Sequence, residues 1–60
     1  MNQLTQSEVN SIREIASAHL TTAVKLNTFA GQCSDNKIKQ MFSTASTQAQ
    51  KGAQDLISML

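Results

Sequence analysis

The sequence predicts an all-α fold, an antiparallel two-helix hairpin that dimerises into a four-helix bundle. The chain has 60 residues, no proline and only two glycines, so little in it interrupts a helix. Apolar residues recur at spacings of three and four along most of its length, which is the helical period. No alternating run or hairpin dipeptide indicates a strand. We therefore expect one domain, residues 1–60, with helices at about 6–32 and 36–60 and a turn at about 33–35.

The first helix has a well-specified start. Thr5 is its expected N-cap, and Glu8, three residues later, supplies the return half of a capping box. The apolar stripe of this helix consists of Val9, Ile12, Ile15 or Ala16, His19, Thr22 or Ala23, Leu26, Phe29 or Ala30, and Cys33. At three places two neighbouring residues fit the stripe, and the sequence leaves the choice open.

The second helix is expected to begin after Asp35, which is a good N-cap residue. Its stripe consists of Ile38, Met41 or Phe42, Ala45, Ala49, Gly52, Leu56, and Met59 or Leu60. Because the connection is short, the two helices are expected to be antiparallel neighbours.

Self-association is expected because a chain this short is marginal without a disulfide, a metal or a partner. It has one cysteine, so an intrachain disulfide is excluded. A homodimer of hairpins encloses both stripes most simply. Its predicted core consists of Ile12, His19, Leu26, Ile38, Phe42 and Leu56, with close helix packing at Ala45, Ala49 and Gly52.

His19 and Cys33 are the residues whose side chains could take part in chemistry. Folding the hairpin places His19 level with Ala49 and Gly52, where we expect a neutral core imidazole hydrogen-bonded to a hydroxyl such as Thr22 or Ser46, a water or the second chain. A metal site needs several matched ligands, so none is predicted and His19 is only a weak candidate. Cys33 is expected to be a small apolar residue at the bundle end and a candidate cross-linking thiol.

Several function classes are disfavoured. The net charge is +1 without a basic block, which argues against nucleic-acid binding. Uninterrupted apolar runs reach two or three residues, far short of a membrane span. Glu8 and Glu14 stand six residues apart and do not form an acid–base pair. The expectation is a protein that is not an enzyme and uses no cofactor.

Three segments together resemble a known family: LTQSEV at the start, KLNTFAGQCSDNKIKQMF across the turn and AQDLISML at the end. They resemble the small spore coat protein F-like group of sporulating Firmicutes, which is assigned to the ferritin-like helical bundles. The most specific part is the turn, at Asp35, Ile38, Lys39 and Gln40. A second group of short sporulation-associated helical proteins resembles the turn about as well.

The resemblance implies a ferritin-like half-bundle and an assembly role in the spore coat. Ferritin-like di-metal proteins place a Glu on one helix and a Glu-x-x-His pair on the next, and these positions fall here at His19, Ala49 and Gly52. The metal ligands are therefore missing from the pattern. We expect a structural protein, cytoplasmic or spore-associated, that binds itself and other coat or regulatory proteins. The alternative is a small regulatory hairpin that binds the helices of a partner protein.

Overall fold

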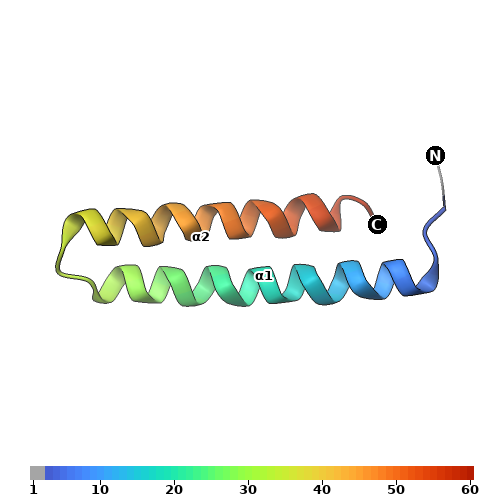
Figure 1. Ribbon diagram of the computed structural model, residues 1–60, viewed down its shortest axis with the longest axis horizontal. Coiled ribbons are helices and arrows are strands. Elements are labelled where there is room, and N and C mark those ends of the chain that lie inside the picture. The colour runs from blue at the N-terminus through green and yellow to red at the C-terminus, as the bar shows by residue number, and fades with distance from the viewer. Residues whose placement is uncertain (1–2) are drawn as a thin grey trace.

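The computed structural model describes residues 3–60 and is an antiparallel hairpin of two helices, as predicted (Figure 1). Helix α1 spans Gln6–Gln32 and helix α2 spans Asn36–Ile57. The start of α1 and the end of α2 lie at the same end of the hairpin, opposite the turn. Residues 1 and 2 of the expected 1–60 unit lie outside the described residues.

The start of α1 is fixed by the predicted capping box. The Glu8 backbone N–H donates to Thr5 Oγ1 at 3.1 Å, and the Thr5 backbone N–H donates to Glu8 Oε1 at 2.8 Å. Two N–H groups that the first helical turn leaves without partners are thereby satisfied. The Thr5 backbone N–H, together with the Thr5 hydroxyl, holds the pKa of Glu8 below its ordinary value.

The turn between the helices is short, because the C-cap of α1 and the N-cap of α2 are only two residues apart. Cys33 follows α1 with an extended backbone, and its N–H donates to the Ala30 carbonyl at 3.3 Å. Asp35 is the predicted N-cap of α2, and its Oδ1 accepts from Lys37 N at 2.9 Å and Ile38 N at 3.0 Å. With so few residues between the caps, the helices fold directly onto each other.

Helix α2 ends earlier than predicted, at Ile57 rather than at residue 60. The N–H groups of Met59 and Leu60 donate three residues back, to Leu56 and Ile57, each at 3.0 Å. This tightened turn replaces the four-residue helical bonds at the chain end. The sequence has no glycine or proline there to signal the stop.

The contact between the helices is made by small residues seven positions apart. Ala16, Ala23 and Ala30 of α1 are buried, and so are Ser46 and Ala53 of α2. Ala53 is 0% exposed. We call these five residues the inner line. A hydrogen bond also crosses between the helices here, because Ser46 Oγ donates to the Ala23 carbonyl at 2.7 Å.

The inner line resolves the choices that the sequence left open on α1. The buried member of each pair is the alanine, while Ile15, Thr22 and Phe29 face outward. On α2, Phe42 is half-buried, whereas Met41 is exposed. Met59 and Leu60 are both exposed. In each α1 pair the smaller side chain is inside and the larger one outside.

The six residues predicted for a dimer core differ in their burial within one hairpin. Ile12 is buried, Ile38 is 47% exposed, and the rest are half-buried, namely His19, Leu26, Phe42 and Leu56. The residues predicted for close packing on α2 lie beside the innermost residues of that helix. Ala45, Ala49 and Gly52 are half-buried, while the innermost residues are Ser46 and Ala53. One residue turns a helix by 100°, so adjacent positions of a broad stripe exchange roles easily.

The hairpin is a thin plate whose Cα atoms extend 47 × 17 × 9 Å. A plate of a single layer has two broad faces and no enclosed interior. Within residues 3–60, neither helix contains a stretch long and apolar enough to cross a membrane.

Candidate interaction face

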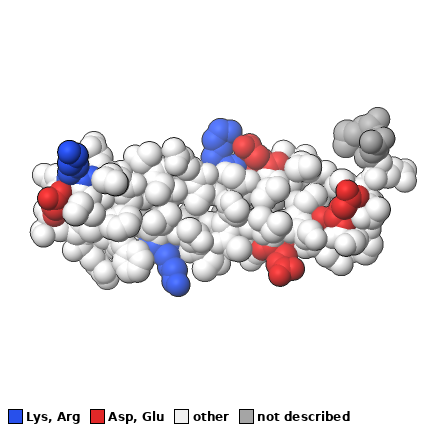
Figure 2. Space-filling model, viewed as in Figure 1, with Lys and Arg blue, Asp and Glu red and all other residues white. Residues whose placement is uncertain are grey.

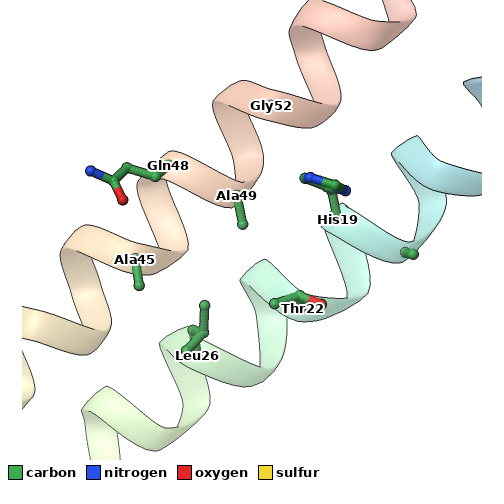
Figure 3. Close-up of a pocket in the computed structure, with 8 residues that line it drawn as sticks. His19, Thr22, Leu26, Ala45, Gln48, Ala49 and Gly52 are labelled. Carbon is green, nitrogen blue, oxygen red and sulfur yellow. The ribbon is translucent and has the colours of Figure 1, made fainter.

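One broad side of the plate carries a shallow groove between the helices. Its lining consists of Ala18, His19, Thr22, Leu26, Ala45, Gln48, Ala49 and Gly52. Figure 3 shows the His19 ring lying between the helices, beside Gly52 on α2. Most of the lining is small because alanines and a glycine of α2 lie opposite the middle of α1. The groove is therefore wide at the centre of the plate.

Larger apolar side chains surround the groove on the same side. Ile15 stands three residues before Ala18, and Phe29 stands three residues after Leu26, so both share their helix face. Met41 lies beside Ala45 and Gln48. Ile38 stands seven residues before Ala45, which is two helical turns. We call the groove lining and these four residues the groove face.

The packing of Phe29 shows how these residues extend the groove. Its ring centroid lies 6.1 Å from that of Phe42, with the planes tilted by 46°. Distances of this kind are typical of favourable aromatic pairs. Phe29 nevertheless remains half exposed, so one side of its ring is available to another surface.

The groove face contains no Lys, Arg, Asp or Glu. In the broad view of Figure 2, the charged side chains lie at the ends and along the edges, and the centre is uncharged. Lys51 and Asp55 pair on the exposed surface of α2 at 3.3 Å. An apolar surface rimmed by charge is the usual composition of a protein contact site.

The opposite broad side differs in composition. A second hollow there is lined by Leu20, Val24, Asn27 and Gln50 together with the inner-line residues Ala23 and Ser46. Arg13 stands seven residues before Leu20 and so shares this side. We call it the back face. It combines isolated apolar residues with amides and a charge, so it is the more polar of the two.

His19 is hydrogen-bonded within its own helix, to a backbone carbonyl that was not among the expected partners. Its Nδ1 lies 3.0 Å from the Ile15 carbonyl, four residues earlier. A carbonyl only accepts, so Nδ1 carries a proton and donates it to this bond. Ser46, one of the expected partners, donates to Ala23 instead. The prediction overlooked that the nearest acceptor for a helical side chain is the preceding turn.

Gly52 provides the room for this imidazole. A Cβ at position 52 would lie 3.0 Å from His19 Cδ2 and 3.5 Å from Nε2. A larger residue would therefore need the ring to move. The sequence predicted this juxtaposition of His19 and Gly52 from the hairpin register.

The donors at the groove do not fit a di-metal carboxylate centre. Such a centre needs a carboxylate from each of several helices and histidines beside them. His19, Ala49 and Gly52, to which the resemblance assigned the ligand positions, line the groove, and only His19 has a side chain that could ligate a metal. Within residues 3–60, no three side chains of His, Cys, Asp or Glu come together. The chemistry of the groove is therefore apolar contact with a few hydrogen-bonding groups at His19, Thr22 and Gln48.

Cys33 lies at the turn end as a half-buried free thiol. It is 14 residues from His19, or about 21 Å along a helix, so the two do not form a nucleophile–base pair.

Sequence reasoning did not identify Ser46 as a contact between the helices and did not include Ala53 in the predicted close-packing set. Their seven-residue spacing, matched by Ala16, Ala23 and Ala30 on α1, was the signal that could have identified them. The same spacing predicts an exposed apolar face, because the large residues next to inward-facing alanines must point outward. No protein-family model, curated protein or solved structure matches this chain, so these contacts carry the functional argument.

Proposed function

We propose that this chain is a non-enzymatic assembly protein that acts by self-association through its groove face. The observation that carries the proposal is the exposure of large apolar residues around an uncharged groove. Ile15 is 47% exposed and Met41 is 66% exposed. Ile38 and Phe29 are exposed to a similar extent on the same face. Leaving so much apolar surface in water is costly, and a second hairpin would cover it.

The size of the face supports a pair of hairpins. A plate of 47 by 17 Å presents about 800 Å² in projection, which is about the area that each partner contributes to an interface of standard size. Two plates stacked in this way form a four-helix bundle, which is the smallest arrangement that gives these helices a common core. The half-buried residues Leu26, Phe42 and Leu56 would then join Ile12 in that core.

The cellular role follows from the resemblance of the turn segment to spore coat proteins. An assembly protein of this kind would work in the cytoplasm or on the spore and contact other coat proteins. A second candidate is a regulatory hairpin that accepts a partner protein's helix in the groove. The small residues Ala45, Ala49 and Gly52 favour it, because they allow another helix to approach closely.

Two lysine substitutions on α1 test the proposal by sedimentation equilibrium. Ile15 belongs to the groove face and is 47% exposed, while Leu20 belongs to the back face and is 41% exposed. We expect the wild-type chain to be a dimer and Ile15→Lys to weaken it at least about a hundredfold. A dimer contains the change twice, and each lost isoleucine contact is worth about 1.5–3 kcal/mol. Leu20→Lys should leave the dimer intact.

Circular dichroism on both variants checks that each remains helical. A wild-type chain that sediments as a helical monomer at high micromolar concentration would contradict self-association and favour the regulatory alternative. Equal weakening by the two lysines would show that the groove face is not the contact.

A further inference from the structure

The groove face, continued by helical spacing to Ser11 on α1 and to Leu56 and Met59 on α2, is self-complementary along both helices. On α1 the residues Ser11, Ile15, Ala18, Thr22, Leu26 and Phe29 follow one another at spacings of four, three, four, four and three. On α2 the residues Met41, Ala45, Gln48, Gly52, Leu56 and Met59 repeat the same spacings. The midpoint of the first series is residue 20, and that of the second is residue 50.

The packing of the hairpin places these two midpoints side by side. Ser46 bonds to Ala23, and Gly52 lies against His19. In an antiparallel pair with this register, residue 20 of α1 lies level with about residue 50 of α2. One line drawn across the plate therefore passes through the middle of both series.

We infer that a second copy of this chain lies on the groove face with its long axis reversed, related by a two-fold axis along that line. The inference rests on the proposed function and specifies its geometry. Such an axis places Ile15 opposite the partner's Leu26, Ala18 opposite the partner's Thr22 and Met41 opposite the partner's Met59. Small side chains meet at the centre and large ones meet towards both ends. The turn of one hairpin covers the open end of the other.

Charges on the rim favour this orientation. Lys25 stands five residues beyond the midpoint of α1, and Glu14 stands six residues before it. Reversal brings Lys25 to within about one residue, roughly 1.5 Å along the axis, of the partner's Glu14, and the contact occurs twice. Within one chain the two residues are 11 positions apart, about 16 Å, which is too far for an ion pair.

The other two-fold arrangement, turn over turn, lacks this complementarity. It would lay α1 along the partner's α2 and bring Glu14 next to the partner's Asp55, which already pairs with Lys51 of its own chain. Like charges at a contact disfavour an orientation even where exposed pairs add little affinity. Apolar contact would thus supply the affinity of the dimer, and the rim charges would select the relative orientation of its two hairpins.

The single native cysteine allows a direct measurement. Cys33 is 13 residues from the midpoint of α1, about 20 Å, so the two Cys33 thiols of a reversed dimer lie about 40 Å apart. In the turn-over-turn arrangement they lie at the same end, within roughly 25 Å given helix spacings of about 10 Å. A nitroxide label on Cys33 and a pulsed dipolar measurement should give a distance near 40 Å. A distance below about 25 Å would overturn the orientation and leave the dimer standing.

Two controls separate the outcomes. The same label on Ser34→Cys in a Cys33→Ser chain uses an exposed turn residue and should give the same long distance. Absence of dipolar coupling, together with a monomer mass in sedimentation, would overturn the proposed function itself. The reversed orientation also means that a Cys33 disulfide could link one dimer to the next but not the two chains of one dimer.

A charge exchange tests the rim contact. Glu14→Lys or Lys25→Glu alone should raise the dimer dissociation constant several-fold, because each places two like-charge pairs in the dimer. The double variant should return to within about twofold of the wild-type constant. Arg13→Glu, a reversal on the back face, should leave the constant unchanged. If the double variant stays as weak as the single ones, Lys25 does not face the partner's Glu14.

Discussion

Neighbouring residues of α1 differ sharply in how far they are buried in this hairpin. Ala16, Ala23 and Ala30 are buried against α2, whereas Ile15 and Phe29, each one position earlier in the chain, are about half exposed. The buried residues are small and the exposed ones are large. Apart from Ile12, which is also buried, the hairpin therefore brings its helices together through small side chains and leaves its larger apolar side chains half-buried or exposed.

The difference shows how the stabilising free energy is divided. Burial of apolar area contributes in proportion to its size, so a line of alanines contributes little per residue. The larger groups on the groove face can contribute more, and they do so only when another surface covers them. A hairpin this small is marginal by itself, and under the proposed function association would stabilise it.

The largest effect is expected for Leu26→Ala on the groove face. Removing a leucine that a dimer buries costs about 2–5 kcal/mol, and the melting temperature should come to depend more strongly on protein concentration. Val24 is its control, since this back-face residue is 67% exposed and Val24→Ala should change stability by no more than about 0.5 kcal/mol. Thermal melts at two concentrations measure both.

The Ile15→Lys background sharpens the Leu26 result. If association is what buries Leu26, then Leu26→Ala should cost much less in that monomeric chain than in the wild type. An equal cost in both chains would mean that the hairpin alone provides the burial.

An intermediate effect is expected for Ala53→Leu on the inner line. Ala53 is 0% exposed, so the added atoms must push the helices apart, at a cost of about 1–3 kcal/mol. Gln54→Leu adds a leucine at the exposed neighbouring position and should be close to neutral. Urea denaturation of the two variants measures the difference. Similar stabilities would show that the helices have room to accommodate a larger residue.

The smallest effect is expected at the capping box, which belongs to neither surface. Thr5→Ala should cost about 1 kcal/mol. Thr21→Ala should cost little, because that exposed hydroxyl bonds only to the Ser17 carbonyl in the preceding turn. Both changes should have the same effect with and without Ile15→Lys, since the cap does not depend on a partner.

Acid should weaken the cap in a defined direction. The pKa of Glu8 in the folded chain lies below its ordinary value of 4.5 because Thr5 donates to the ionised carboxylate. The stabilisation is therefore complete above the unfolded value and is lost as the pH falls through the lowered folded value. The stability difference between wild type and Glu8→Ala should shrink over that acidic range, and a difference that grows would contradict the capping geometry.

The sequence was a good guide to the local features and a weaker one to the contact between helices. Thr5, Glu8 and Asp35 act within one turn of their own positions, so their roles follow from chemistry that the sequence displays. The choice between Ile15 and Ala16 depends instead on how closely α2 approaches. Both residues belong to the broad apolar stripe, and the distance between the helices decides which of the two is buried.

Two other expectations failed for local reasons. The end of α2 carries no stop signal in the sequence, and Met59 and Leu60 nevertheless form three-residue bonds. The expected partners of His19 were a hydroxyl such as Thr22 or Ser46, a water or a second chain, whereas the observed partner is the Ile15 carbonyl of its own helix. Whether His19, Leu26 and the other predicted core residues meet in a dimer stays a prediction.

The register of the hairpin also orders its contacts by the length of chain that each one closes. Near the turn, Ala30 comes against α2 after a loop of a few residues, while Ser46 and Ala23 are separated by 23 positions. Ala16 and Ala53, farther from the turn, close a still longer loop, and longer loops cost more chain entropy. Folding is therefore favoured to proceed from the Asp35 turn outward, and local unfolding to proceed from the opposite end of the hairpin towards the turn. A hairpin that opens this way exposes Ala16 and Ala53 to solvent while Ser46 still holds the two helices together.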